Sequence, residues 1–370
     1  MTPFERRTRA CQRRLREQET EAVVLFPSRN LQYTTSFVEE PGERHLFFIV
    51  PAAGEPVFVV PELYGKQLRS ETWVTDVRTW GDSDDPRTLI ETVVRNSSID
   101  PQNRLLVDDT MGARFTQELR SLFPTATFGL ASEVLASLRR RKDDAEIESL
   151  KTAAAITDQV VASVRGLGSD AIGLTESELA ADIEKRLQAA GGSGVSFAPI
   201  VGSGPNGAKP HHSHEDREIR PGEPVVLDFG TRVEGYPSDQ TRTLVFDGEP
   251  PEKVTDVHEI VMDAQAAAVD AVAPGVEAST VDTAARDVIE SAGYGDQFIH
   301  RTGHGVGLDV HEEPYIVADN DRTLQPGMVF SIEPGVYVSD EFGVRIEDLM
   351  VVTEDGCERL NHADRGLMCA

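Results

Sequence analysis

Cysteine is scarce in this sequence, with only three residues among 370. Cys11, Cys357 and Cys369 show no paired spacing, which argues against both a disulfide framework and a thiolate zinc site. The N-terminal stretch MTPFERRTRACQRRLREQ is strongly charged and contains no apolar core of the kind that a secretion signal has. We therefore expect a protein of the reducing cytoplasm.

Long apolar runs and basic residues are also lacking. No run approaches the length of a membrane span. Acidic residues outnumber basic ones 63 to 36, and the formal net charge is −27, which argues against nucleic acid or an anionic membrane as a partner. Such a surface can simply be well solvated, but we favour a halophilic adaptation, because a salt-rich cytosol screens the self-repulsion.

The length of the chain and its hydrophobic content of 39% predict two domains with substantial cores. In the first, the apolar runs AVVLF, HLFFIV, PVFVV and RLLVDD alternate with helical patterns, which is typical of an α/β domain. We expect it to span residues 1–136 and to contribute no chemistry, since it has no cluster of acids or histidines. The second domain, residues 137–370, should begin with a helix over residues 139–164.

The second domain contains an internal repeat that carries acidic residues at matched positions. In each copy a Pro-Gly turn precedes a short apolar strand that ends in an acid and a glycine, and the two acids are Asp228 and Glu333. Each strand is followed by a second strand with another acid, Asp239 or Glu347. Helical patterns at residues 178–192 and 280–295 precede the two copies. Lone turn aspartates are usually solvated, but this repeat indicates an internal pseudo-symmetry that brings four acids together.

Three histidines and several glycines lie between the two copies, in the stretch HRTGHGVGLDVHEEP. The glycines argue against a helical face and indicate a backbone that approaches a ligand closely. A single histidine is more often structural. Three of them, His300, His304 and His311, beside four acids favour a metal centre.

The set Asp228, Asp239, His304, Glu333 and Glu347 lies in the motifs LDFG, SDQTRT, HRTGHGVGLDVHEEP, SIEPGVY and VRIEDLMVV. This pattern resembles the dinuclear metallopeptidases of the pita-bread (creatinase/aminopeptidase) fold, and among them the Xaa-Pro peptidases, prolidase and aminopeptidase P. The resemblance implies an α/β N-terminal domain followed by an α+β pita-bread domain with internal pseudo-two-fold symmetry. It also implies a homodimer.

The resemblance further implies a role for each residue. Asp239 and Glu347 would bridge two divalent metals, Asp228 would complete one coordination sphere, and His304 and Glu333 the other. The hard, oxygen-rich ligand set favours manganese or cobalt, with zinc or iron possible. A hydroxide between the metals would attack the bond before proline, with Glu333 handling its proton. The remaining expected site residues, which contact substrate, stabilise the intermediate or orient the ligands, are His211, His300, His311 and Arg345.

Several alternatives stay open at this stage. Both a dipeptidase and an aminopeptidase fit the motifs, and so does a metal-dependent hydrolase of a small non-peptide amide. A binding module with a dead site fits poorly, since no ligand is missing. Arg345 is expected to hold Asp239 or Glu347, and the neighbouring His212 and His214 are expected to be ordinary loop residues. Gln240, at a position that is usually apolar in the family, is expected to face away from the metals.

Overall fold

The computed structural model describes residues 1–97 and 99–369, so that Ala370, the last residue of the predicted second domain, lies outside the described residues. The chain divides into two compact units, Met1–Arg139 and Arg140–Ala370. Helix α6 spans the border predicted after residue 136. None of the described helices combines the length and apolarity needed to cross a membrane.

The N-terminal unit is an α/β layer structure built on one mixed sheet. Its described strands are ordered β4-β3-β2-β1-β5-β6. The pairs β1–β2 and β2–β3 are antiparallel, and the other neighbours are parallel. The strands are β1 (Ala22–Leu25), β2 (Phe47–Pro51), β3 (Val57–Pro61), β4 (Asp76–Trp80), β5 (Arg104–Val107) and β6 (Thr127–Leu130). The helices are α1 (Pro3–Glu17), α2 (Arg29–Thr35), α3 (Glu62–Glu71), α4 (Pro86–Asn96), α5 (Ala113–Leu122) and α6 (Ser132–Arg139).

Local sequence explains these elements. The strands β2 and β3 are apolar throughout and buried at every position, as strands covered on both faces must be. Helix α1 begins at a threonine whose side chain accepts a hydrogen bond from the Glu5 N–H, with proline in the first turn. The core includes a cluster of aromatic rings, in which Phe26 and Phe115 lie 4.9 Å apart. The α/β class expected for this domain is confirmed.

The C-terminal unit is built from two halves of similar design. The first half contains α7 (Asp144–Arg165), α8 (Glu176–Ala189), η1 (Gly168–Ala171), η2 (Gly204–Ala208), β7 (Ile200–Ser203), β8 (Val225–Phe229), β9 (Arg232–Val233), β10 (Tyr236–Pro237) and β11 (Gln240–Leu244). The second contains α9 (Glu252–Asp270), α10 (Ala278–Ser291), η3 (Gly295–Gln297), β12 (Gly303–Gly305), β13 (Glu312–Ile316), β14 (Val329–Ile332), β15 (Gly335–Val338), β16 (Phe342–Arg345), β17 (Asp348–Val352) and β18 (Cys357–Arg359).

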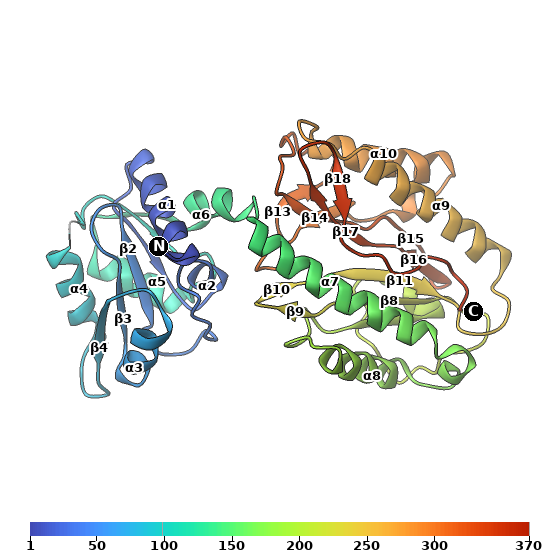
Figure 1. Ribbon diagram of the computed structural model, residues 1–370, viewed down its shortest axis with the longest axis horizontal. Helices are drawn as coiled ribbons and strands as arrows, with labels where there is room; N and C mark the ends of the chain where they lie inside the picture. Colours follow the sequence, from blue (N-terminus) through green and yellow to red (C-terminus); the bar gives the residue numbers. More distant parts are fainter. Residues whose placement is uncertain (98, 370) are drawn as a thin grey trace. The chain divides into compact units, whose positions relative to one another are not determined.

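Each half has its own sheet and its own hydrophobic core. The described strands of the first sheet are ordered β11-β8-β7, and those of the second β13-β12-β14-β17-β18. Helices α7 and α8 pack on the first sheet, and α9 and α10 pack on the second. In Figure 1 the strands of this unit lie between the two helix pairs. The corresponding antiparallel pairs β8–β11 and β14–β17 confirm the predicted pita-bread class, in which the sheets of the two halves meet at the functional site.

The motif VRIEDLMVV was expected to form one strand, and this expectation is wrong. The structure splits it into β16, paired with β15, and β17, paired with β14. Between them the N–H of Glu347 donates to the carbonyl of Thr241 in β11, 3.1 Å away. Since each backbone N–H makes its bond with one partner, this link between the two halves interrupts the ladder at Glu347.

Candidate metal centre and active site

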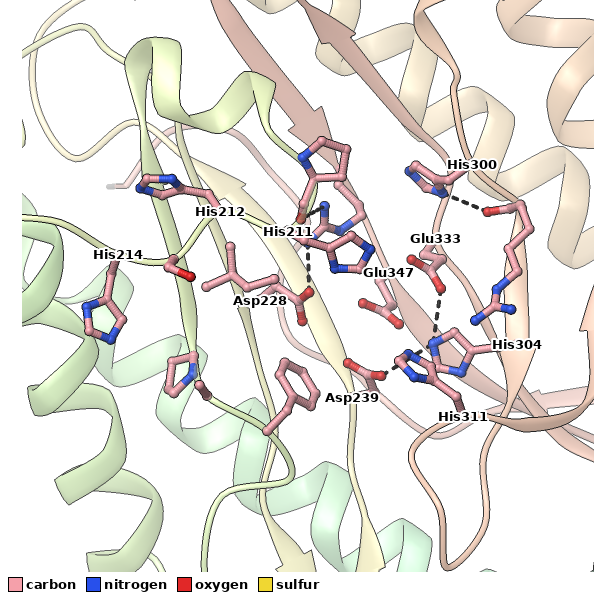
Figure 2. Close-up of a pocket in the computed structure, with 18 residues that line it drawn as sticks. His211, His212, His214, Asp228, Asp239, His300, His304, His311, Glu333 and Glu347 are labelled. Carbon is pink, nitrogen blue, oxygen red and sulfur yellow. Dashed lines mark hydrogen bonds and ion pairs between the residues drawn. The ribbon is translucent and has the colours of Figure 1, made fainter. Parts of the chain in front are cut away.

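A cavity of about 470 Å³ opens in the C-terminal unit where the two halves meet. The residues predicted for the site all line it, and Figure 2 labels all of them except Arg345. The lining residues with ionisable side chains are Asp228, Asp239, Glu333, Glu347, His211, His212, His214, His300, His304, His311, Arg301 and Arg345. Its apolar wall is formed by Phe197, Ala198, Pro199, Ile200 and Pro210.

Four carboxylates reach this cavity from the ends of strands. Asp228 lies in β8 beside Thr241 of β11, and Asp239 immediately precedes β11. Glu333 directly follows β14, and Glu347 occupies the break between β16 and β17. The side chains of Asp239, Glu347 and His304 offer ligand atoms that all lie within 4.8 Å of one another. Strand ends from both halves of the repeat therefore converge on one point.

The burial of these carboxylates requires a compensating charge. Asp239 is 3% exposed and Glu347 only 1%. Among the described residues, Asp228 Oδ1 and Glu347 Oε1 are buried without a hydrogen-bond partner. An unpaired buried carboxylate oxygen is costly unless a cation satisfies it. Oxygen-rich clusters with one imidazole suit divalent metals, so the donor set fits a metal centre.

The pKa values of these carboxylates show that their negative charges also repel one another. Burial and the neighbouring carboxylates Glu347, Asp228 and Glu333 raise the pKa of Asp239 well above its usual value. Burial, followed by the charges of Glu333 and Asp228, raises the pKa of Glu347 in the same way. Burial also acts to raise the pKa of Glu333, but the hydrogen bond and charge of His304, with His300 and Arg345, lower it to about 2.

His304 is oriented with one ring nitrogen toward the carboxylates. Its Nδ1 lies 3.2 Å from the carbonyl oxygen of Gly305, so that Nδ1 is the donor there. Its Nε2 lies 3.2 Å from Glu333 Oε1 and 3.6 Å from Asp239 Oδ2, as the dashed lines in Figure 2 show. The tautomer fixed by Gly305 leaves Nε2 as the atom that can bind a metal.

Two of the glycines around His304 allow neighbouring strands to pack closely. A Cβ on Gly303 would lie 1.9 Å from the carbonyl oxygen of Ser331 in β14, and one on Gly305 would lie 2.4 Å from the backbone of Glu313. Both glycines therefore allow close packing of β12 against its neighbouring strands.

Arg345 was expected to hold Asp239 or Glu347, but its direct carboxylate partner is Asp228. Its Nη2 donates to Asp228 Oδ2 at 2.7 Å. Its Nε donates to the Thr241 hydroxyl at 3.0 Å, and that hydroxyl donates to Glu347 Oε2 at 2.7 Å. Asp228 is the direct partner because β8 and β11 lie side by side where β16 ends. Arg345 reaches Glu347 only through Thr241.

The remaining predicted residues surround the carboxylates. His300 Nε2 lies 2.9 Å from the hydroxyl of Tyr337, and its Nδ1 lies 2.7 Å from the carbonyl of Arg301. The rings of His304 and His311 have centroids 4.1 Å apart. Burial, followed by the charges of His304 and Arg301, lowers the pKa of His311 to about 4. Figure 2 shows the ring of His211 directed toward the carboxylates.

His212 is not an ordinary loop residue, contrary to expectation. Its Nε2 lies 2.7 Å from Glu176 Oε2, and Glu176 is fully buried at the start of α8. Glu176 also accepts hydrogen bonds from Ser203, Asn206 and the N–H of Glu215. This buried carboxylate therefore ties the loop that carries His211 to α8. His214 differs from His212, because its Nδ1 contacts a hydroxyl near the surface, that of Ser177, 3.1 Å away.

We expect His212→Ala to lower the free energy of unfolding by about 1–3 kcal/mol, because a buried carboxylate then loses one donor. Urea denaturation followed by circular dichroism measures this difference. His214→Ala is the matched control, and we expect a change of less than about 0.5 kcal/mol for it. Equal effects of the two substitutions would contradict the role given to Glu176.

Sequence reasoning missed Thr241, Tyr337 and Glu176, which orient the ligands and the loop. Thr241 had a detectable signal in its position, since it lies two residues after Asp239 in the strand that follows this ligand, and that strand is buried at every position. Gln240 donates to Asp158 of α7 at 2.9 Å, in keeping with a side chain directed away from the carboxylates.

Comparisons with known proteins agree with this geometry. The model of metallopeptidase family M24 matches residues 148–354, and that of the creatinase/prolidase N-terminal domain matches residues 7–141. A Mycobacterium tuberculosis protein named Probable dipeptidase PepE is 43% identical over 350 residues, which cover 94% of this chain and 91% of that protein. A Lactobacillus helveticus protein named Xaa-Pro dipeptidase is 37% identical over 357 residues, covering 95% and 96%.

Solved structures show the same relationship. The crystal structure of a recombinant prolidase from Thermococcus sibiricus has a TM-score of 0.94 and 40% identity, and the match covers 100% of this chain and 99% of that one. A dipeptidase from Pyrococcus horikoshii has a TM-score of 0.92 and 40% identity, covering 98% and 99%. Both domains, the fold and the group of side chains that could hold a metal lead to one assignment, and the chain belongs to metallopeptidase family M24.

Proposed function

We propose that this enzyme hydrolyses the peptide bond before proline in Xaa-Pro dipeptides, using two divalent metal ions. The observation that carries the proposal is the group of four carboxylates and His304 on the cavity wall, with two buried carboxylate oxygens that lack partners among the described residues. Relatives named Xaa-Pro dipeptidase and prolidase support the choice of substrate.

The ligand roles that we propose are those implied by the family resemblance, and the positions of the residues in the two halves support them. Asp239 and Glu347 come from opposite halves and offer ligand atoms that lie, with that of His304, within 4.8 Å of one another, which supports the role of contacting both cations that the family resemblance implies. Asp228 would complete the site nearer β8, and His304 with Glu333 the site nearer β14. Divalent cations bound there supply Lewis acidity, which polarises a carbonyl and makes water a better nucleophile.

The chain's own residues handle protons and substrate. Glu333 has a pKa lowered to about 2, so it is ionised near neutral pH and can accept a proton from the attacking water. His211 and His311 line the same cavity and can stabilise charge on the carbonyl oxygen or donate a proton to the leaving amine. The apolar wall of Phe197, Pro199 and Ile200 suits a proline ring and excludes water from it.

The finer expectations belong to the same proposal. Manganese or cobalt are the metals that the oxygen-rich ligand set favours. The homodimer and the cytoplasmic, halophilic character stay predictions from the sequence and its resemblance.

The direct test is hydrolysis of a dipeptide and a matched tripeptide, Leu-Pro and Leu-Pro-Gly, in high salt. Each is measured with chelator-stripped protein and again after manganese or cobalt is restored. We expect metal-dependent cleavage of the dipeptide, with little for the stripped protein. Cleavage of the tripeptide alone would assign an aminopeptidase instead. Absence of cleavage by protein that contains two bound metals would contradict the peptidase assignment.

A further inference from the structure

A buried ion pair lies beside the segment that carries His304 and His311. It joins Lys142, which precedes the N-cap residue of helix α7, to Glu312, the first residue of β13. The Lys142 Nζ donates to Glu312 Oε1 at 2.8 Å, and the two side chains are 0% and 12% exposed. Neither residue is among the described residues that line the cavity. The pair can therefore affect the chemistry only through other residues.

The backbone around Lys142 is anchored to the second half of the unit. The N–H of Lys142 donates to the carbonyl of Gly327 at 2.8 Å, and Arg141 forms a β-bridge with Met328. A Cβ on Gly327 would lie 2.9 Å from the Lys142 carbonyl oxygen, so this close approach requires a glycine. Gly327 lies in the turn before β14, the strand that Glu333 follows. The ammonium of Lys142 therefore extends from the scaffold that also places Glu333.

Glu312 lies between the two histidines of this segment. It directly follows His311, and it is the cross-strand partner of Gly305, which directly follows His304. A Cβ on Gly307 would collide with the carboxylate of Glu312, so this carboxylate lies directly against the turn between the two histidines. The ion pair thus holds the carboxylate that supports this turn.

A buried ion pair contributes little net stability, because removing two charges from water costs about as much as their attraction returns. Its stronger effect is geometric, since a charged donor and a charged acceptor 2.8 Å apart restrict each other's position. We propose that Lys142 and Glu312 are positioning residues, which fix the turn between His304 and His311 and thereby hold His311 in the orientation that the reaction requires. This inference rests on the proposed function, in which His311 stabilises charge or donates a proton.

The test is a double-mutant cycle on kcat for Leu-Pro hydrolysis by the metal-loaded protein. Lys142→Met removes the charge, and it should lower kcat about 10- to 100-fold with KM and metal content unchanged, because small misplacements of a reacting group have effects of that size. When His311 is already alanine, the same substitution should change kcat less than about 2-fold, because Lys142 acts through His311. In the His211→Ala background it should keep its full effect, because His211 lies on another loop.

Two further variants separate positioning from stability. Lys142→Met leaves the Glu312 carboxylate without this cation and should lower the melting temperature. The double variant Lys142→Met with Glu312→Gln removes both charges and should melt close to the wild type, yet its kcat should stay low because the restraint is missing. The cycle is therefore run with both variants. Lys151→Met is the control, since Lys151 forms an exposed ion pair with Glu358 at 2.7 Å, and it should change neither quantity.

Hydrogen exchange of the metal-loaded proteins, measured by mass spectrometry, gives a readout that does not depend on activity. Peptides that cover residues 305–312 should exchange at least about 10-fold faster in Lys142→Met and in the double variant than in the wild type. Peptides that cover β8 should exchange at the wild-type rate in both. Lys151→Met should leave both segments unchanged.

Additive effects of Lys142→Met and His311→Ala on kcat would overturn the inference and leave the proposed function intact. A double variant that regains full kcat together with its melting temperature would do the same. Unchanged exchange of residues 305–312 would overturn the inference whether or not Leu-Pro is cleaved. A wild type that does not cleave Leu-Pro, combined with faster exchange of this segment in Lys142→Met, would refute the proposed function and leave the positioning of the turn intact.

Discussion

Replacing Glu347 by glutamine should lower kcat/KM for a metal-dependent Xaa-Pro hydrolysis by at least about 1,000-fold, because the cation loses a charged oxygen ligand in the centre of the site. Glu347 is 1% exposed, and its Oε1 has no hydrogen-bond partner among the described residues. Its Oε2 accepts from Thr241, and a glutamine oxygen can keep that bond. The variant should therefore fold while losing its metal.

The same substitution should have the opposite effect on the metal-free protein. The raised pKa of Glu347 means that its ionised form disfavours the folded state, so metal-free stability falls as pH rises through that raised pKa. Glutamine carries no charge and removes this penalty. We expect Glu347→Gln to have a higher melting temperature than the wild type when both are stripped of metal at pH 8, and a lower one when both are supplied with metal.

Glu354→Gln is the control for this pair of measurements, because Glu354 is exposed in the turn after β17. It should change neither kcat/KM nor the order of melting temperatures. A Glu347→Gln variant that retains full activity would show that Glu347 does not hold a cation. A variant that melts below the wild type in the metal-free state would contradict the charge penalty assigned to Glu347.

Replacing Arg242 by methionine should lower the free energy of unfolding by about 3–5 kcal/mol, because it breaks a buried charge pair. Arg242 is 1% exposed, and its Nη2 donates to Asp348 Oδ1 at 2.7 Å. Its Nη1 donates to the carbonyl oxygens of Thr241 and Glu347, at 2.9 and 2.7 Å. The side chain thus joins β11 to the segment before β17, directly behind two residues of the site.

We also expect metal affinity to fall by about 10- to 100-fold in Arg242→Met, since the groups that orient ligands contribute effects of that size. Urea denaturation and metal titration measure the two effects. Arg359→Met is a useful comparison, because Arg359 also contacts Asp348 but is more exposed, at 22% of its side chain. Arg359→Met should lower the free energy of unfolding by less than Arg242→Met does, and it should leave metal affinity unchanged. The double variant Arg242→Met with Asp348→Leu should recover part of the lost stability. Wild-type stability in Arg242→Met would contradict the role of this pair.

The sequence was sufficient to predict the fold class and to select the residues that meet in the cavity. Asp228 and Glu333 follow Pro-Gly turns at identical spacing, and short buried strands place such residues at equivalent ends of two sheets. Local pattern and repetition therefore carry this information.

Partners across strands could not be predicted in the same way. The choice of Asp228 as the partner of Arg345 depends on how β8 and β11 lie beside the end of β16, and no local pattern encodes that arrangement. His212 was missed for a related reason, because its partner Glu176 lies 36 residues earlier, on a different element. The break at Glu347 arises from a bond to the other half of the molecule, which a continuous apolar pattern conceals.

The most direct test of the metal centre is the number of manganese ions that remain bound per chain after equilibrium dialysis, measured for the wild type and for Asp239→Asn. We expect two ions for the wild type. We expect fewer in Asp239→Asn, because Asp239 lies within reach of both His304 and Glu347. Two ions bound equally by both proteins, or none bound by the wild type, would contradict the account.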